Sequence, residues 1–185
     1  MQPYAAEVLR SLGYEGTGET HYRLNAQALT GDLSTPILPD GVSVRSMRDD
    51  TGDFAARVEV HRSVWAPSKL TLEGYERLRT KPLYRGDLDL VVETAEGDLA
   101  AYCIVWWDPV TKAGEFEPVG TVDCFRGRGF GKAVLIEGLR RLRDLGAGYA
   151  TVISGMGPES EPARRLYASA GFEPVFTFDQ WKKPV

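Results

Sequence analysis

A glycine-rich turn carries residue types suited to holding an anionic phosphate group. It reads Arg126-Gly127-Arg128-Gly129-Phe130-Gly131-Lys132. Alternating glycines leave backbone N–H groups open to close approach, and a helix predicted to begin here adds unpaired N–H donors and the positive end of its dipole. Residues 126–143 contain six basic residues and one acidic residue, in a chain of net charge −4. This local reversal of sign at a helix N-terminus suits a pyrophosphate ligand.

The spacing of the turn excludes the two common nucleotide-binding loops. A P-loop needs four residues between its first glycine and its Gly-Lys pair, followed by Ser or Thr. Here three residues intervene and Ala133 follows. A dinucleotide fingerprint that began at Gly127 or Gly129 would place its third glycine at Lys132 or Val134. Another phosphate-bearing ligand is therefore expected.

Candidate proton acceptors lie on one predicted strand and one predicted helix. Glu115 and Glu117 are two residues apart in the strand, so both are expected to project to one face, together with Val119. A carboxylate whose pKa is raised by burial could accept a proton directly or through water, and Glu117 is the first choice. His61 titrates near neutral pH and is the alternative base. A solvated strand position or a satisfied helix histidine is the structural alternative for these residues.

Composition narrows the classes of protein that the chain can belong to. With 185 residues, 43% apolar and 26% charged, it is typical of a folded globular domain. The longest apolar run, Leu99–Trp107, is far shorter than the ~20 residues of a membrane-spanning helix, and no signal segment opens the chain. Cys103 and Cys124 predict no disulfide framework, and the isolated histidines His21 and His61 predict no metal site. We expect a soluble, cytoplasmic protein that binds neither metal nor nucleic acid nor membrane.

The elements that must position these residues form consecutive strands first and alternating elements later. Helices are predicted at residues 3–12, 54–65, 71–78, 129–145 and 162–170, with Asp49 or Asp50 and Ser68 or Thr71 as N-caps. Strands are predicted at 19–24, 42–47, 88–94, 99–107, 115–122, 149–154 and 175–181, with a linker at 25–41. This order predicts an α+β fold, a mixed and mostly antiparallel sheet flanked by helices.

Three segments together resemble one known family. Arg126-x-x-Gly129-x-Gly131 before a long amphipathic helix resembles the acyl-CoA pyrophosphate loop of the GNAT superfamily of N-acyltransferases. Residues 117–122 resemble the family's fourth strand, and Ala163-x-x-Leu166-Tyr167-x-x-x-Gly171-Phe172 resembles its C-terminal helix and turn. The resemblance covers about residues 40–185. Two positions depart from the pattern: Asp123 replaces a frequent proline and would bring negative charge toward the phosphates, and Ser160 replaces a frequent asparagine.

The resemblance implies acetyl transfer from acetyl-CoA to a primary amine of a small molecule or peptide, by direct attack. Tyr167 is then the general acid, Glu117 the first choice of base, and His61 and Trp65 lie on the acceptor side. The residues implied in binding acetyl-CoA are Val119, Thr121, Arg126, Gly127, Gly129, Gly131, Lys132 and Ser160, with a backbone donor near Val119 for the oxyanion. A homodimer is left open. The alternative is a non-catalytic or regulatory module that binds acyl-CoA.

The N-terminal segment repeats the pattern of the C-terminal end. The aligned positions are Ala5, Val8, Leu9, Ser11, Gly13, Tyr14 and Glu15 with Ala163, Leu166, Tyr167, Ser169, Gly171, Phe172 and Glu173. We therefore predict a helix–strand appendage with a linker over residues 1–40 and a GNAT acetyltransferase domain over 41–185, similar to tandem-domain members. Because Leu9 aligns with Tyr167, the appendage cannot supply the same chemistry.

Overall fold

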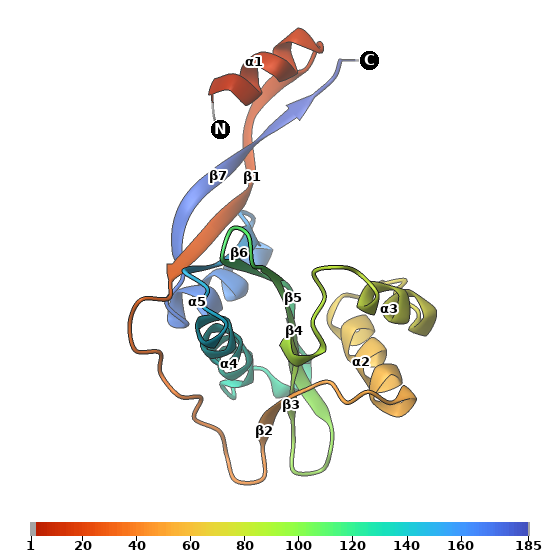
Figure 1. Cartoon of the computed structure of the whole chain (residues 1–185). Coiled ribbons are helices and arrows are strands. Elements are labelled where there is room, and N and C mark those ends of the chain that lie inside the picture. The colour runs from red at the N-terminus through yellow and green to blue at the C-terminus, as the bar shows by residue number, and fades with distance from the viewer. Residues whose placement is uncertain (1–2, 185) are drawn as a thin grey trace. The chain divides into compact units, whose positions relative to one another are not determined.

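The structure is a computed structural model that describes residues 3–184 (Figure 1). Its described part divides into two compact units: a terminal unit, residues 3–27 with 151–184, and a central unit, residues 28–150. The candidate phosphate-binding turn, both candidate bases and the predicted acceptor residues belong to the central unit, whereas Tyr167 and Ser160 belong to the terminal unit.

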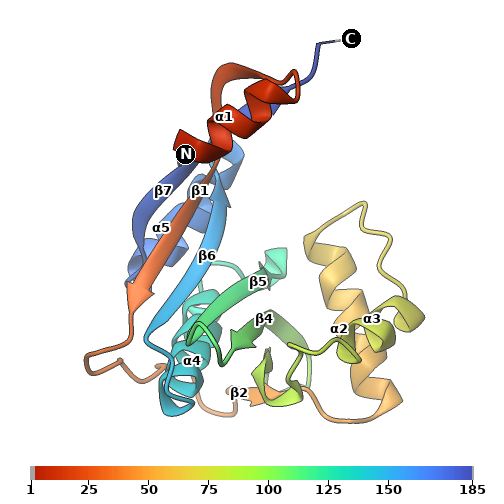
Figure 2. The ribbon, with the colours of Figure 1, turned by 45° about the horizontal axis from the view of Figure 1, so that its top comes forward.

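Four antiparallel strands form the sheet of the central unit. They follow in the order β2 (Ser43–Ser46), β3 (Asp89–Glu93), β4 (Leu99–Asp108) and β5 (Ala113–Thr121). One face is covered by α4 (Phe130–Asp144), and the other by α2 (Thr51–Val64) and α3 (Leu72–Arg79) (Figure 2). β3 and β4 are almost wholly buried, as expected of strands covered on both faces.

Small and large side chains fix how closely the helices approach this sheet. On the α4 face, Gly138 lies so near Phe116 that a Cβ there would stand 2.5 Å from the phenyl ring. On the other face, a Cβ at Gly120 would stand 2.7 Å from the Tyr102 ring and 2.9 Å from Val64 of α2. Both glycines are therefore required by close packing.

The terminal unit contains three strands, in the order β6 (Tyr149–Gly155), β1 (Glu15–Ala28) and β7 (Glu173–Lys182). β1 and β7 are antiparallel, with three register irregularities along their length. The buried Asn25 side chain of β1 donates to the Val152 carbonyl at 3.0 Å and to Ser154 Oγ at 3.1 Å. The helices α1 (Pro3–Ser11) and α5 (Glu161–Ser169) complete this unit, and short 3₁₀ turns occur at Gly86–Leu88, Asp123–Phe125 and Pro158–Ser160.

The predicted fold class is confirmed, and so are the helix starts that depended on capping. Asp50 accepts a hydrogen bond from the N–H of Asp53 at 2.8 Å, and Thr71 accepts one from the N–H of Gly74 at 3.1 Å. The predicted strand at 19–24 was too short, since β1 runs from Glu15 to Ala28 and includes the first residues assigned to a linker. Its register irregularities interrupt the alternation of side chains on which that prediction depended.

Candidate functional site

The turn predicted to bind pyrophosphate forms the N-terminus of α4. Gly127 and Gly129 have φ values of +76° and +82°, a conformation that favours glycine. Gly129 is the N-cap of α4 and offers no side-chain cap, and the first helical hydrogen bond runs from the N–H of Ala133 to the carbonyl of Gly129 at 2.9 Å. The N–H groups of the three residues between them have no acceptor within the helix. The turn thus presents backbone donors to an anion.

The space around the two glycines is open. A Cβ at Gly127 or at Gly129 would meet no atom within 4 Å apart from those of the adjoining residues. The buried side chain of Phe130 anchors the turn to the core of the unit. The centroid of its ring lies 6.2 Å from that of Phe125. The predicted ligand residue Gly131 is buried in the first turn of α4. The buried Phe130 ring therefore holds the backbone of the turn in place and leaves its N–H groups uncovered.

Asp123, the position that departs from the family pattern, pairs with a basic residue of the turn. Its Oδ1 lies 2.8 Å from Nη2 of Arg126, and both side chains are exposed. The Arg128 guanidinium lies 5.4 Å from the centroid of the Phe125 ring. Among residues 3–184, Arg128 and Lys132 form no ion pair. These two residues therefore carry the positive charge of the turn that is not already neutralised.

A β-bulge interrupts β5 at the candidate base. The two strands pair at Cys103–Val119 and at Val105–Phe116. Glu117 and Pro118 therefore stand opposite one residue of β4. Proline has no N–H to give to the strand ladder, so a bulge is a position where it is tolerated. The predicted ligand residue Thr121 lies beyond the bulge, opposite Ala101.

The bulge changes which side chains share a face. Val119 stands opposite Cys103, whose thiol lies 3.8 Å from a main-chain carbonyl of α4, so Val119 is on the α4 face. Glu115 stands opposite Trp106, on the face of α2 and α3. The prediction that Val119 shares a face with Glu115 and Glu117 is therefore wrong, because the extra residue reverses the alternation between them.

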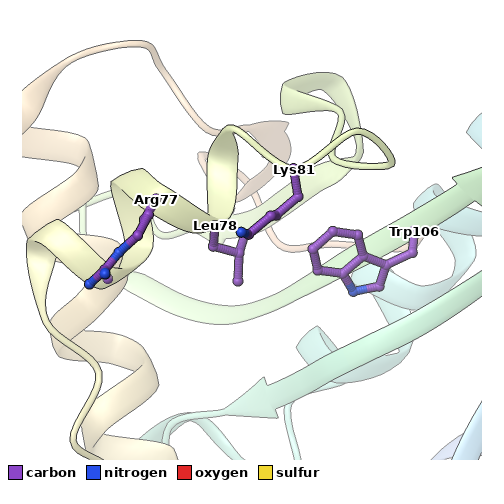
Figure 3. Close-up of a pocket in the computed structure, with 5 residues that line it drawn as sticks. Arg77, Leu78, Lys81 and Trp106 are labelled. Atoms are coloured by element: carbon purple, nitrogen blue, oxygen red, sulfur yellow. The ribbon is translucent and has the colours of Figure 1, made fainter.

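The candidate base Glu117 lies beside a small groove. Surrounding protein atoms exclude enough water to raise the pKa of the Glu117 carboxyl above its ordinary value, and the charge of Glu115 raises it further. The Trp106 indole N–H donates to the Glu117 carbonyl at 2.7 Å. Trp106 also lines a groove of about 320 Å³ against α3 and the segment after it, whose other lining residues are Gly74, Arg77, Leu78 and Lys81 (Figure 3). The groove therefore adjoins the bulge.

A buried ion pair that was not predicted from the sequence lies beneath α2 and α3. Asp89 is 0% exposed and Arg57 is 1% exposed, and Arg57 Nε lies 3.3 Å from Asp89 Oδ1. The hydroxyls of Tyr75 and Tyr84 donate to Asp89 Oδ2 at 2.6 and 3.1 Å. Nη1 of Arg57 is buried and has no hydrogen-bond partner among residues 3–184. The sequence does contain a signal for the burial of Arg57: it lies one helical turn before His61, on the apolar face of α2.

The His61 imidazole is held by a neighbour of this ion pair. Its Nδ1 lies 2.9 Å from the Tyr102 hydroxyl, and the Arg57 guanidinium lies 3.7 Å from the centroid of the Tyr102 ring. Burial, and then the positive charge of Arg57, lower the pKa of His61 from its ordinary value. Burial raises the pKa of Tyr102 to about 12. His61 is therefore a neutral imidazole beside a protonated phenol at neutral pH. Trp65, the C-cap residue of α2, is half exposed.

Two predicted site residues lie in the terminal unit. Tyr167 on α5 is 8% exposed, and its ring packs edge-on against Phe172 at 6.2 Å. Ser160 precedes α5, its side chain does not cap the helix, and its N–H donates to the Gly157 carbonyl at 3.1 Å. Arg164 donates to the Gly157 carbonyl at 2.9 Å and thereby holds the same turn. Their roles in acetyl transfer remain predictions.

The described residues offer neither a metal site nor a membrane span. No group of three or more His, Cys, Asp or Glu side chains within residues 3–184 could hold a metal ion. In the same range, the helices are too short or too polar to cross a membrane.

Comparison with known proteins decides the family. Residues 57–172 match the family model of GNAT acetyltransferases. The chain belongs to the GNAT acetyltransferase family. The predicted resemblance is thereby confirmed, and the match includes α4 with its N-terminal turn, β5 and α5. The chain therefore carries an acetyltransferase domain, and members of this family use acetyl-CoA.

Relatives of known sequence and structure are longer than this chain. It is 28% identical over 188 residues to a mycothiol acetyltransferase of Nocardioides sp., covering 92% of this chain and 62% of that protein. A mycothiol acetyltransferase of Kineococcus radiotolerans is 27% identical and is covered over 58% of its length, against 97% of this chain. The fold is similar to that of a GCN5-related N-acetyltransferase from Sphaerobacter thermophilus, with a TM-score of 0.76 at 20% identity over 97% of this chain and 56% of that one. A tandem GNAT protein from the clavulanic acid biosynthesis pathway gives a TM-score of 0.72 at 16% identity, over 98% of this chain and 58% of that one.

Proposed function

We propose that this chain transfers an acetyl group from acetyl-CoA to a primary amine. The observation that carries the proposal is the uncapped N-terminus of α4, with two left-handed glycines and no atom near either Cβ position. Such a turn offers backbone donors and the positive end of a helix dipole to a pyrophosphate. Family membership makes CoA the phosphate-bearing ligand to expect.

The cosubstrate is held mainly by main-chain groups in this proposal. The backbone of the turn, at Gly127, Gly129 and Gly131, binds the phosphates. Lys132 and Arg128 add positive charge, and Arg126 contributes by neutralising the Asp123 carboxylate. The backbone of Val119 and Thr121 beyond the bulge binds the pantetheine arm and supplies the oxyanion donor, and Ser160 contributes a further polar contact. The Asp123 carboxylate repels the phosphates only weakly, because its negative charge is paired with Arg126.

We assign the general base to a carboxylate, that of Glu117, and the general acid to a phenol, that of Tyr167. The amine nitrogen attacks the thioester carbonyl carbon, so that a C–N bond forms and the C–S bond breaks. Glu117 takes the proton that the amine loses, directly or through a water molecule, and its raised pKa suits this role. Tyr167 gives a proton to the departing thiolate, since a phenol stays protonated at neutral pH.

The acceptor is an amine of a small molecule or peptide that binds on the α2 and α3 face. His61 and Trp65 contact it in this proposal, and the groove beside Trp106 lies on the same face. The two curated relatives named above are mycothiol acetyltransferases, so mycothiol-related amines come first in a panel of acceptors.

The test separates binding from turnover. CoA is expected to raise the melting temperature of the protein more than ATP does, and acetyl-CoA with the right amine is expected to release free CoA. Tyr167→Phe should lower kcat while CoA binding is unchanged. CoA binding with no amine-dependent release would favour the non-catalytic acyl-CoA-binding module, and stabilisation by ATP alone would overturn the assignment of the turn.

The division of the chain is part of the proposal. Residues 41–185 form the acetyltransferase domain, and residues 1–40 are a helix–strand appendage that has the pattern of a GNAT C-terminal end. The echo of the C-terminal end supports this, as does the likeness to a tandem GNAT protein that the chain covers over 58% of its length.

A further inference from the structure

The hydrogen bond between Tyr102 and His61 has a direction that the neighbouring groups determine. The indole of Trp65 and the guanidinium of Arg57 also interact with the Tyr102 hydroxyl. An indole and a guanidinium donate hydrogen bonds and accept none. Within residues 3–184, the acceptor that the structure gives the hydroxyl proton is Nδ1 of His61 at 2.9 Å.

The buried carboxylate nearby does not offer an alternative acceptor. Asp89 receives Arg57 on Oδ1 and the hydroxyls of Tyr75 and Tyr84 on Oδ2. The residue of β5 opposite Tyr102 is Gly120, which brings no side chain of its own. Burial, and then the positive charge of Arg57, lower the pKa of His61 and favour the neutral imidazole.

We infer that Tyr102 donates to Nδ1 and fixes His61 in the neutral tautomer that carries its proton on Nε2. His61 then presents a hydrogen-bond donor to the acyl acceptor, and it is not the general base. Nε2 has no hydrogen-bond partner among residues 3–184, and the side chain is partly exposed, so this N–H is available to a ligand. Tyr102 is a positioning residue, since it acts through His61.

This assignment narrows the chemistry of the acceptor. An N–H donor directed at the amine lone pair would oppose its attack, so His61 is suited to an oxygen atom of the acceptor, such as a hydroxyl, carbonyl or carboxylate near the amine. The inference about the acceptor rests on the proposed function, whereas the tautomer is a property of the protein alone.

The tautomer is measured first, on the full chain without substrates. Nitrogen-15 NMR of the imidazole distinguishes a protonated Nε2 from a protonated Nδ1, and the expected result at pH 7.5 is a single neutral species with its proton on Nε2. Tyr102→Phe keeps the ring over Arg57 and removes the hydroxyl, so a second species with the proton on Nδ1 should become detectable. The matched control Tyr84→Phe removes a hydroxyl that does not touch His61 and should leave the wild-type spectrum.

Substitutions of His61 then test the donor role. Glutamine can place an amide N–H near the position of Nε2, so His61→Gln should retain kcat/KM within about threefold, whereas His61→Ala should lose about tenfold, mainly through the acceptor KM. The acidic limb of the pH profile should stay in place in His61→Gln, because the base is Glu117.

The outcomes of these measurements are distinct. A wild-type spectrum with the proton on Nδ1, or a protonated imidazole at pH 7.5, would overturn the inference whether or not the protein transfers acetyl groups. Loss of the acidic limb in His61→Gln would also overturn it, because that limb would then belong to His61. Absence of acetyl transfer together with the Nε2 tautomer would count against the proposed function and leave the tautomer established.

Discussion

At the scale of single residues, the central unit depends on a charge pair that is fully enclosed. Asp89 and Arg57 are buried on different elements, β3 and α2, and two tyrosine hydroxyls complete the coordination of the carboxylate. A buried ion pair is costly to form, but removal of one partner leaves the other charge without compensation. Substitution of one partner alone is therefore expected to lower the free energy of unfolding strongly.

We expect Asp89→Asn to lower the free energy of unfolding by about 3–5 kcal/mol, because Arg57 would stay buried without its counter-charge. Urea denaturation followed by circular dichroism measures the difference. The control is Glu59→Gln, which breaks the exposed pair with Arg62 at 3.4 Å and should cost at most about 1 kcal/mol. Equal losses in the two variants would contradict the distinction between buried and exposed pairs.

Glu93 makes the central unit sensitive to acid. Hydrogen bonds from Arg45 and then Arg48 lower the pKa of Glu93 to about 2, from an ordinary value of 4.5. Because the folded-state pKa is the lower one, the stabilisation is complete above pH 4.5 and is lost as the pH falls toward 2. At neutral pH it is on the order of 3 kcal/mol.

Glu93→Gln should therefore be less stable than the wild type at pH 7 by about 2–3 kcal/mol, and the difference should shrink between pH 5 and pH 3. Urea denaturation at a series of pH values gives both quantities. Glu96→Gln, at an exposed turn position of the same hairpin, is the control and should show no such trend. A difference that does not change with pH would argue against the ion-paired carboxylate.

The same residues show what a sequence can and cannot predict about a site. The glycines of the turn and Tyr167 could be proposed as site residues because residue type and spacing alone carry their motifs. Burial of Asp89 depends on Arg57 and Tyr75, which are 32 and 14 residues away in sequence. From the sequence alone, an aspartate at the start of a strand is expected to be solvent-exposed. Only the fold shows that Arg57 and Tyr75 pack against Asp89.

At the scale of elements, the N-terminus of α4 is the part of the site whose charge can be tested most directly. We expect Gly129→Asp to weaken CoA binding by about 100-fold relative to Gly129→Asn, because a carboxylate would stand among donors that the phosphates require. Both variants bear the same backbone strain at φ +82°, so their difference isolates the charge. Calorimetric titration with CoA measures it, and melting curves verify that both variants fold.

Elements also divide into those that local sequence determines and those that pairing determines. Asp50 and Thr71 start their helices through side chains that cap within three residues, so residue type narrowed each cap to two candidates, Asp49 or Asp50 and Ser68 or Thr71. The bulge at Glu117 and Pro118 arises from one residue in excess over β4. Pro118 is the local signal for it, but only the pairing with β4 shows that an extra residue is present. The face of Val119 was predicted wrongly for that reason.

At the scale of the whole molecule, the N-terminal segment is integrated into the terminal unit by strand pairing. β1 lies between β6 and β7 in the strand order, and its buried Asn25 joins it to β6. The sequence repeat predicted a helix followed by a strand here, and the structure shows both. That the strand would pair inside the sheet of the C-terminal residues could not be predicted, because pairing partners are more than a hundred residues apart.

Deletion of residues 1–24 should therefore destabilise the terminal unit strongly, because it removes most of β1 and leaves two strands with unpaired edges. Deletion of residues 1–13 removes α1 and spares β1, and it should have a much smaller effect. Thermal unfolding and size-exclusion chromatography of both truncated chains measure stability and oligomeric state. Unchanged stability after the longer deletion would show that the segment is dispensable.

The two cysteines differ in a way that is useful for kinetic labelling. Cys124 is exposed just before the candidate phosphate-binding turn, whereas Cys103 is buried in β4, and burial raises the pKa of its thiol. A thiol reagent should modify Cys124 rapidly in the native protein, where an attached dye would report on ligands arriving at the turn. Cys103 should react only when the sheet opens. The slow rate of its modification would therefore measure how often the central unit unfolds.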